Sequence, residues 1–482
     1  MAIGAINPPK DFDNMSYNEL EKLNLEARER STNASNDELA EKYLEYLEKE
    51  DAIKAVIVGF SDLEGRFHTL DYDKKFLVDS HQNLTFDGSS VRGYSVVDES
   101  DLRLILDWSS FRFLPADIFG ESKVLVFGRI HDKDGSPFES DMRSRLAELS
   151  DKLKKEHGYT TNVAVEVEGF LFKGDSAEQN YNSRDGFEFM STGGYYNALP
   201  KDELKTFIDS LAAAKRALGF ENEKDHPEVA PSQFELNYKY TNAVNAADQI
   251  QLYKILARQI AATRGLTACF LPKPVANING SGMHTNISLS KDGTNIFYDK
   301  DGEDGLSKLG WSCIDKILSS ANDICLVMNP SVNAYRRLDP AFEAPNQIKS
   351  SAVDRTSMVR VPLANKNSAR IEVRTVSPGA NPYMWLYTLF RTMLEGPMTD
   401  TVNDDNRKTR TKFLPGNIRP SLRHFKSSSY MKEVLGESTH GKYVELKQAS
   451  MDRCPKELGT IVKTEEIIFH HDVTNQFLWS KF

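Results

Sequence analysis

Five glutamates of this chain lie inside short apolar segments that alternate like β-strands. NVAVEVEGF carries Glu166 and Glu168 two residues apart, and a period of two puts both side chains on one face of a strand. HPEVAPSQFEL carries Glu228 and Glu235, and ARIEVR carries Glu372. A solvated strand face would explain any one of these segments. Five carboxylates in apolar surroundings, however, need cations as partners, and this need constrains the fold strongly.

A divalent metal ion is the simplest partner for these acids. Oxygen-rich sites with one imidazole suit Mg²⁺ or Mn²⁺, whereas zinc prefers sulfur and nitrogen ligands. His284, in the glycine-rich stretch NINGSGMHTNIS, is the candidate imidazole, although a histidine taken alone is more often a hydrogen-bonded structural residue. The sequence therefore predicts a metal site made mainly of carboxylates.

Arginines are dense in the second half of the chain. They occur in YRRLDPAFEAP, SSAVDRTSMVRVP and NSARIEVR, as the pairs Arg336 and Arg337, Arg355 and Arg360, and Arg370 and Arg374. Scattered surface charge would explain each pair singly. Guanidinium groups beside metal-binding carboxylates are what phosphoryl transfer needs, because metals bridge the phosphates while arginines take up charge. We expect a metal-dependent, ATP-using enzyme, and the sequence contains neither GxxxxGK[ST] nor GxGxxG.

Length and patterning predict two domains. A single hydrophobic core stops growing at about 250–300 residues, and this chain has 482 residues. Residues 1–36 are polar and are interpreted as an N-terminal extension. Residues 37–138 combine a helix beginning near Asn36 with short strands, and residues 139–482 mix long helices with strands. The expected fold class is α+β, with a small domain followed by a large one.

Charge and composition argue against several classes of partner. With 60 Lys and Arg against 70 Asp and Glu, the net charge of −10 repels polyanions, so no nucleic-acid partner is expected. No segment reaches the roughly 18 apolar residues of a membrane helix, so no membrane partner is expected. The four cysteines show no CxxC pairing, which favours a cytoplasmic location.

Nine ordered motifs resemble glutamine synthetase of the bacterial type. They are FDGSSVRGYSVVDESDLRL, AVEVEGFLF, GGYY, HPEVAPSQFE, GLTACFLPKP, NGSGMH, NPSVNAYRRLDPAFEAP, RIEVR and GANPY, and the resemblance covers about residues 50 to 450. The resemblance implies a small β-grasp domain followed by a large catalytic domain. It also implies homo-oligomeric rings, hexamers or dodecamers, with each active site between neighbouring subunits.

The resemblance also implies a reaction and its ligands. The reaction is ATP-dependent ligation of ammonia to the γ-carboxylate of L-glutamate through γ-glutamyl phosphate, so ATP, L-glutamate and ammonium are the expected small molecules. Two divalent cations, Mg²⁺ or Mn²⁺, are expected in each site. By motif position, Glu168, Glu228 and Glu235 would hold one ion, and Glu166, His284 and Glu372 would hold the other.

Further roles follow from the same resemblance. Asp87 would take the proton of ammonium, Glu343 would close over the intermediate, and Arg355 would stabilise the transferring phosphoryl group. Glutamate would be bound by Asn279, Gly280, Arg337 and Arg374. Ammonium would lie among Asp87 and Ser90 of the adjacent subunit, Tyr195 and Glu228, and the nucleotide would meet Tyr240, Ser288, Arg360 and Arg370.

Departures from the resemblance leave alternatives open. Asn286 stands where many relatives have a second histidine, and it brings no positive charge; residues 464–482, TEEIIFHHDVTNQFLWSKF, also look unlike the standard chain. A ligase that joins glutamate to a larger amine and a non-catalytic structural relative are the competing hypotheses. The complete set of metal ligands argues against the second, and the unaltered ammonium pocket favours ammonia as the acceptor.

Overall fold

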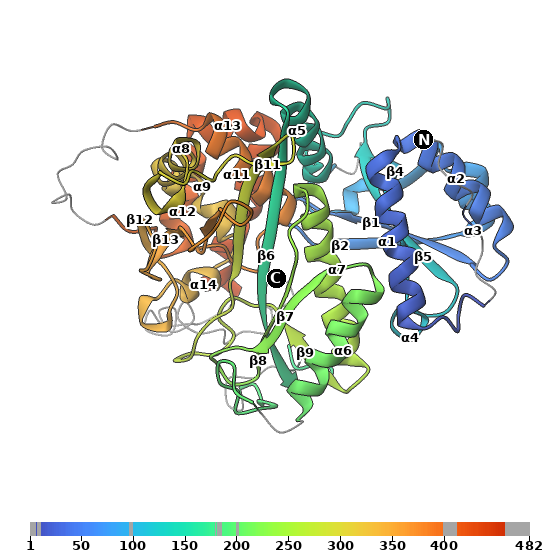
Figure 1. Ribbon diagram of the computed structural model, residues 1–482, viewed down its shortest axis with the longest axis horizontal. Helices are drawn as coiled ribbons and strands as arrows, with labels where there is room; N and C mark the ends of the chain where they lie inside the picture. The colour runs from blue at the N-terminus through green and yellow to red at the C-terminus, as the bar shows by residue number, and fades with distance from the viewer. Residues whose placement is uncertain are drawn as a thin grey trace.

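The computed structural model describes residue 6 and residues 11–95, 100–178, 180, 186–198, 202–398 and 412–457, with side chains described to residue 452. The segment 464–482, expected to differ from the standard chain, lies outside the described residues. Two hydrophobic cores underlie the described part. One lies mainly in the small domain, and the other lies mainly in the large domain but also includes Leu125 and Phe127 of the small domain. Figure 1 shows these two parts side by side, with the N-terminal part in blue.

A five-stranded sheet forms the small domain. Its strands are β1 (Ala55–Ser61), β2 (Phe67–Asp73), β3 (Leu84–Asp87), β4 (Asp101–Phe113) and β5 (Lys123–His131), in the spatial order β2-β1-β5-β4-β3. Only the β1–β5 pair is parallel; the other pairs are antiparallel. The short helices of this domain are α3 (Lys74–Ser80) and α4 (Ala116–Phe119).

Two N-terminal helices precede this sheet. They are α1 (Tyr17–Asn33) and α2 (Asn36–Lys49), and each begins with a serine–glutamate capping box. Helix α2 confirms the helix expected near Asn36. Helix α1 was not predicted from the sequence. Its buried side chains, Leu20, Asn24 and Ala27, form only a narrow stripe in an otherwise polar segment. Asn24 donates to the carbonyl oxygens of Phe113 (2.9 Å) and Ala217 (2.7 Å), so α1 joins the small-domain sheet to the large domain.

The large-domain sheet is built around one long strand, β6 (Tyr159–Lys173), which runs through the centre of Figure 1. The other strands are β7 (Asn222–Pro227), β8 (Gln233–Tyr238), β9 (Leu266–Cys269), β10 (Met283–Lys291), β11 (Thr294–Asn295), β12 (Gln347–Ser351), β13 (Ser357–Arg360) and β14 (Ile371–Val373). The order is β12-β13-β14-β10-β6-β8-β7, with β9 pairing to the far end of β6 and β11 to β10. Strands β12 and β7 are therefore the two edges of this sheet.

The helices of the large domain pack against this sheet and against one another. They are α5 (Met142–His157), α6 (Glu203–Ala217), α7 (Ala243–Ala262), α8 (Lys308–Ser319), α9 (Ala321–Met328), α10 (Ala334–Arg337), α11 (Pro382–Glu395), α12 (Ile418–Ser427), α13 (Ser429–Leu435) and α14 (Glu437–Glu457). Val163, Val165 and Val167 of β6 belong to the same buried core as side chains of α5, α7 and α11. Strand alternation therefore leaves the glutamates of β6 on the opposite face.

A buried ion network joins the two domains. Arg143 of α5 binds Asp107 of β4 (Nη1–Oδ2 2.9 Å) and Asp248 of α7 (Nη2–Oδ2 2.8 Å). Tyr383 of α11 also donates to Asp248 (2.7 Å). Burial raises the pKa of Asp107, but the charge of Arg143 and of a second arginine outweighs it and holds that pKa well below its usual range. Asp107 is thus ionised and paired inside the protein, and Asp248 binds the same arginine.

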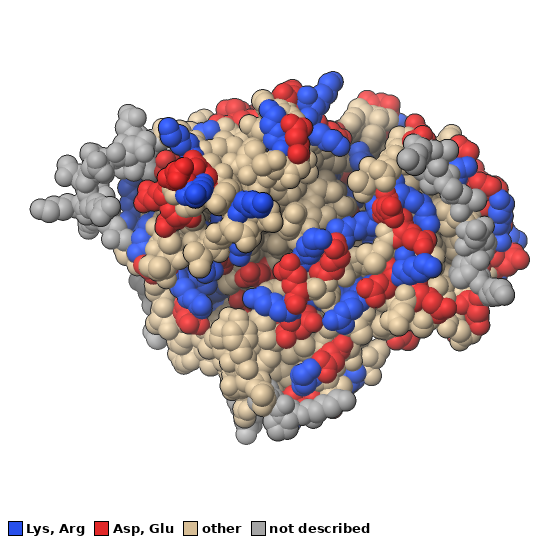
Figure 2. All heavy atoms as spheres, in the orientation of Figure 1, with Lys and Arg blue, Asp and Glu red and all other residues tan. Residues whose placement is uncertain are grey.

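The α+β class expected from the sequence is confirmed, with a small domain followed by a large one. The strand-like segments around Glu166, Glu235 and Glu372 are β6, β8 and β14. None of the described helices is long and apolar enough to span a bilayer. Acidic and basic side chains are interspersed over the face seen in Figure 2.

Candidate active site

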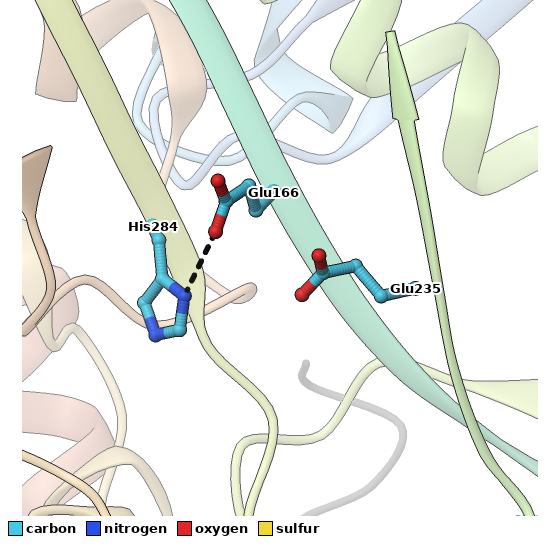
Figure 3. A group of neighbouring side chains, drawn as sticks. All are labelled: Glu166, Glu235 and His284. Atoms are coloured by element: carbon cyan, nitrogen blue, oxygen red, sulfur yellow. Dashed lines mark ion pairs between the residues drawn. The ribbon is translucent and has the colours of Figure 1, made fainter. Parts of the chain in front are cut away.

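Sheet register brings all six predicted metal ligands to one cavity of about 290 Å³. Glu166 lies opposite His284 of β10, and Glu168 lies opposite Glu235 of β8. Figure 3 shows Glu166, Glu235 and His284 projecting from three neighbouring strands into the same space. The full set lining the cavity is Glu166, Glu168, Glu228, Glu235, His284 and Glu372.

Distances among these groups suit a shared cation. The Nδ1 atom of His284 lies 3.5 Å from a Glu166 oxygen and 3.7 Å from a Glu168 oxygen. One ligand atom each from Glu166, Glu235 and His284 lies within 4.8 Å of the others. Carboxylate oxygens with one imidazole are a donor set for Mg²⁺ or Mn²⁺, so these residues fit a divalent ion.

His226 is a member of the cluster that the sequence reasoning missed. It pairs in register with Glu235, and its Nδ1 and Nε2 atoms lie 3.5 Å from oxygens of Glu228 and Glu235 respectively. Its Nε2 atom is buried without a hydrogen-bond partner among the described residues. His226 and Glu228 stand two residues apart in HPEV, so the alternation used for Glu166 and Glu168 could have found it.

Crowded carboxylates give the site unusual electrostatics. Burial, followed by the charges of Glu168 and Glu235, raises the pKa of Glu228 to about 9. Burial also raises the pKa of Glu168. For Glu166, burial acts in the same direction, but the hydrogen bond and charge of His284 outweigh it and lower the pKa to about 2. The protein alone therefore cannot hold every carboxylate ionised, and added positive charge would relieve this repulsion.

Arginines form the other part of the lining. Arg337 is 2% exposed; it donates to the carbonyl oxygens of Arg374 (2.8 Å) and Val376 (3.2 Å). Glu372 receives Arg360 (2.9 Å) on one oxygen and Arg374 (3.2 Å) on the other. The arginines that line the cavity are Arg337, Arg355, Arg360, Arg370 and Arg374.

Close backbone approach explains the glycines of NGSGMH. A Cβ on Gly282 would lie 2.7 Å from His284 Nε2 and would also collide with Arg337, so a side chain there would displace both. Next to it, Asn279 donates to Glu343 (2.9 Å), which has a left-handed backbone with φ 60°. Asn279, Gly280 and Glu343 all line the cavity.

Four of the predicted site residues do not line this cavity, whereas Tyr195 does. Asp87 and Ser90 are on the small domain, where the Asp87 carboxylate accepts from Ser89 N (2.9 Å) and Ser90 Oγ (2.6 Å). Tyr240 is exposed just after β8, and Ser288 on β10 accepts from Asn162 (3.2 Å). The structure thus gathers fifteen of the nineteen predicted residues at one cavity.

A larger cavity of about 600 Å³ lies at the junction of the two domains. Its lining includes Arg66, Glu178, Lys254, Arg258 and Lys447. None of the six predicted metal ligands lines it. The smaller, highly charged cavity is therefore the better candidate for the chemistry.

This chain is similar to known proteins in both sequence and fold. The family description "Glutamine synthetase, beta-Grasp domain" matches residues 52–133, and "Glutamine synthetase, catalytic domain" matches residues 139–462. Glutamine synthetases of Methanosarcina mazei and Clostridium saccharobutylicum are each 34% identical over 84% of this chain, covering 92% and 94% of their own lengths.

Two solved structures are similar as well. A protein called GmaS, in complex with ADP, superposes with a TM-score of 0.74 at 25% identity, covering 88% of this chain and 98% of that one. A cryoEM structure of Plasmodium falciparum glutamine synthetase gives a TM-score of 0.76 at 20% identity over 89% of this chain and 98% of its own, which bears on the fold alone.

Proposed function

This chain belongs to the glutamine synthetase family, and from that premise we propose that it ligates ammonia to the γ-carboxylate of L-glutamate. ATP phosphorylates the carboxylate to γ-glutamyl phosphate and leaves as ADP; ammonia then attacks the acyl carbon, and inorganic phosphate leaves. The observation that most supports this proposal is the meeting of six metal-ligand side chains and five arginines at one cavity. Such a lining suits a reaction that moves a phosphoryl group.

Two divalent cations, Mg²⁺ or Mn²⁺, are part of the proposal. Glu168, Glu228 and Glu235 would hold one ion, and Glu166, His284 and Glu372 the other. When bound, the ions neutralise the carboxylates and the phosphate oxygens. The raised pKa of Glu228 and the short distances within the cluster support this assignment.

The remaining lining residues have roles that fit their surroundings. Buried Arg337 and Arg374, with Asn279 and Gly280, would bind glutamate, because carboxylates favour guanidinium partners. Arg355, exposed at the cavity, would contact the transferring phosphoryl group. Glu343, tied to Asn279, would help close the site against water, which would otherwise hydrolyse the intermediate.

Ammonium activation and nucleotide binding complete the proposal. Asp87 would remove a proton from ammonium with Ser90, Tyr195 and Glu228 nearby. Since Asp87 and Ser90 do not line the cavity of their own chain, a second copy would supply them, in hexameric or dodecameric rings in the cytoplasm. Tyr240, Ser288, Arg360 and Arg370 would contact ATP, and the ADP complex of the related GmaS supports a nucleotide site.

A coupled assay tests this function. Purified protein with Mg²⁺, ATP and glutamate should release phosphate and form glutamine when ammonium is added. When methylamine, ethanolamine or a polyamine replaces ammonium, little phosphate should be released. Release with a larger amine but not with ammonium would replace the proposal with a ligase for larger amines. Absence of release with every amine would contradict both enzymatic functions.

A further inference from the structure

Lys224 is the only lysine among the described residues that line the charged cavity. It lies on β7, the edge strand of the large-domain sheet, and its side chain is exposed. The β7–β8 ladder is irregular between Asn222 and Asp225, so Lys224 falls in the irregular segment. Irregular strand positions of this kind commonly redirect a side chain, and here the lysine lines the cavity.

Most of the arginines around the cavity already have partners within the protein. Arg337 binds backbone carbonyls, and Arg360 and Arg374 pair with Glu372. Arg370 donates from Nε to Asn286 (2.8 Å). Lys224 differs, because it forms no hydrogen bond or ion pair with any described residue. The Arg355 side chain resembles Lys224 in this respect, since only its backbone oxygen has a partner, Arg374.

Among the described residues that line the cavity, the centre of the sheet face offers no further unpaired cation. Asn286 lies there, neutral, and its amide bridges the two sides: Nδ2 donates to Glu166 (3.2 Å) and Oδ1 accepts from Arg370. Free positive charge therefore stands at the margins of the cavity. Lys224 is on edge strand β7, and Arg355 lies two residues before β13, near the opposite edge, with four strands between β7 and β13.

We propose that Lys224 binds phosphate oxygens of the nucleotide, so that Lys224 and Arg355 hold the polyphosphate from opposite edges of the sheet. This inference rests on the proposed function and deepens it by naming a nucleotide-binding residue. A lysine on an edge strand suits the task, because its flexible stem and point charge follow a phosphate chain that carries metal ions. Lys224 lines the same cavity as the glutamates and arginines, so its charge is available to a ligand there.

Titration of the full-length protein with ADP and Mg²⁺ in a calorimeter tests the inference. We expect Lys224→Ala to weaken ADP binding about 3- to 10-fold, the range for one exposed charge-assisted contact. Lys224→Arg keeps the charge and should stay close to wild type. Lys205→Ala, which removes an exposed lysine of α6 paired with Asp209, is the matched control and should not change the affinity.

Salt and metal titrations sharpen the test. The affinity of the wild type for ADP should fall more steeply with salt than that of Lys224→Ala. The reason is that the variant lacks the charge pair between Lys224 and phosphate, which salt would screen. Mn²⁺ affinity, measured by electron paramagnetic resonance without nucleotide, should stay equal or rise, since a cation near Glu166 is gone. Weaker Mn²⁺ binding in Lys224→Ala would overturn the inference, because the lysine would then support the metal site instead.

The outcomes separate this inference from the function beneath it. If wild-type protein binds no ADP, the proposed function itself fails. If the wild type binds ADP and Lys224→Ala binds it equally well, the lysine is a solvated surface residue and only this inference falls. Loss of affinity in Lys224→Ala with retention in Lys224→Arg would support it.

Discussion

The carboxylate of Glu372 forms ion pairs with two guanidinium groups. Arg360 and Arg374 each take one of its oxygens. A divalent cation at Glu372 would compete with these arginines for the same lone pairs. The displaced guanidinium groups would then be available to anions, so metal loading and phosphate binding would support each other.

Glu228 gives a pH-dependent prediction for metal-free protein. Its pKa is raised to about 9 in the folded chain, against an ordinary value of 4.5. The folded state therefore binds this proton more tightly than the unfolded state. The resulting stability is fully present below the ordinary pKa and is lost as the pH rises toward about 9. In Glu228→Gln this loss disappears, so the variant should gain a few degrees in melting temperature over wild type between about pH 5.5 and 8.5.

Melting curves recorded with a chelator across this pH range check the prediction. Excess Mg²⁺ is the control, because bound metal compensates the ionised carboxylate and should abolish the advantage of the variant. Parallel pH profiles for the two metal-free proteins would contradict the raised pKa of Glu228.

Asp87 gives a prediction about proton transfer. The hydrogen bonds from Ser89 and Ser90 lower its pKa, so it stays ionised over the assay range and can accept a proton. Asp87→Asn preserves the shape but cannot accept that proton, and we expect kcat with ammonium to fall about 10²- to 10⁴-fold. Steady-state kinetics measure this, and Mn²⁺ affinity should not change. The control is Asp101→Asn, which alters the exposed carboxylate opposite Asp87 on β4; an equal loss in both variants would mean that Asp87 has no special role.

At the scale of elements, the sequence predicted what depends on local alternation. The segment around Glu166 and Glu168 is a strand, and both side chains line the cavity. The pairing of the strands could not be predicted from the sequence. The contacts of Glu235 with His226 and of Glu166 with His284 depend on the register between separate strands. Helix α1 was missed for a different reason: three buried positions in seventeen residues give a weak apolar period.

The Arg143 network is an element-scale feature with a measurable cost of removal. Arg143→Met would leave Asp107 and Asp248 buried without their main cation. Breaking a buried pair in this way typically costs about 3–5 kcal/mol, so we expect a loss of that size in the free energy of unfolding. Chemical denaturation measures it.

Arg129→Ala is the matched control, because Arg129 pairs with the same Asp107 (3.2 Å) but is 35% exposed. It should cost less than about 1 kcal/mol. Equal effects of the two substitutions would show that burial does not determine the contribution of these pairs.

At the scale of the whole molecule, the proposed site is completed between copies. Protein carrying Asp87→Asn and protein carrying Arg355→Ala should each be nearly inactive. Mixed rings should recover about a quarter of wild-type activity, because random assembly pairs an intact Asp87 with an intact Arg355 in that share of interfaces. Co-expression with two affinity tags isolates the mixed assemblies.

One further mixture controls this experiment. Wild type mixed with the double variant should also follow random pairing, at about the same quarter. An inactive mixture of the two single variants would mean that the site is complete within one chain.

The buried junction between the domains has a consequence for inheritance. Arg143 and Asp107 fix each small domain to its own large domain, while Asp87 on that small domain would serve the neighbouring cavity. A subunit in which this junction is weakened would thus keep the side chains of its own cavity in place. It would misplace the Asp87 that the cavity of the neighbouring subunit needs. In a cell that makes both wild-type and variant protein, wild-type subunits beside variant ones would lose activity as well. Such an allele would therefore act dominantly.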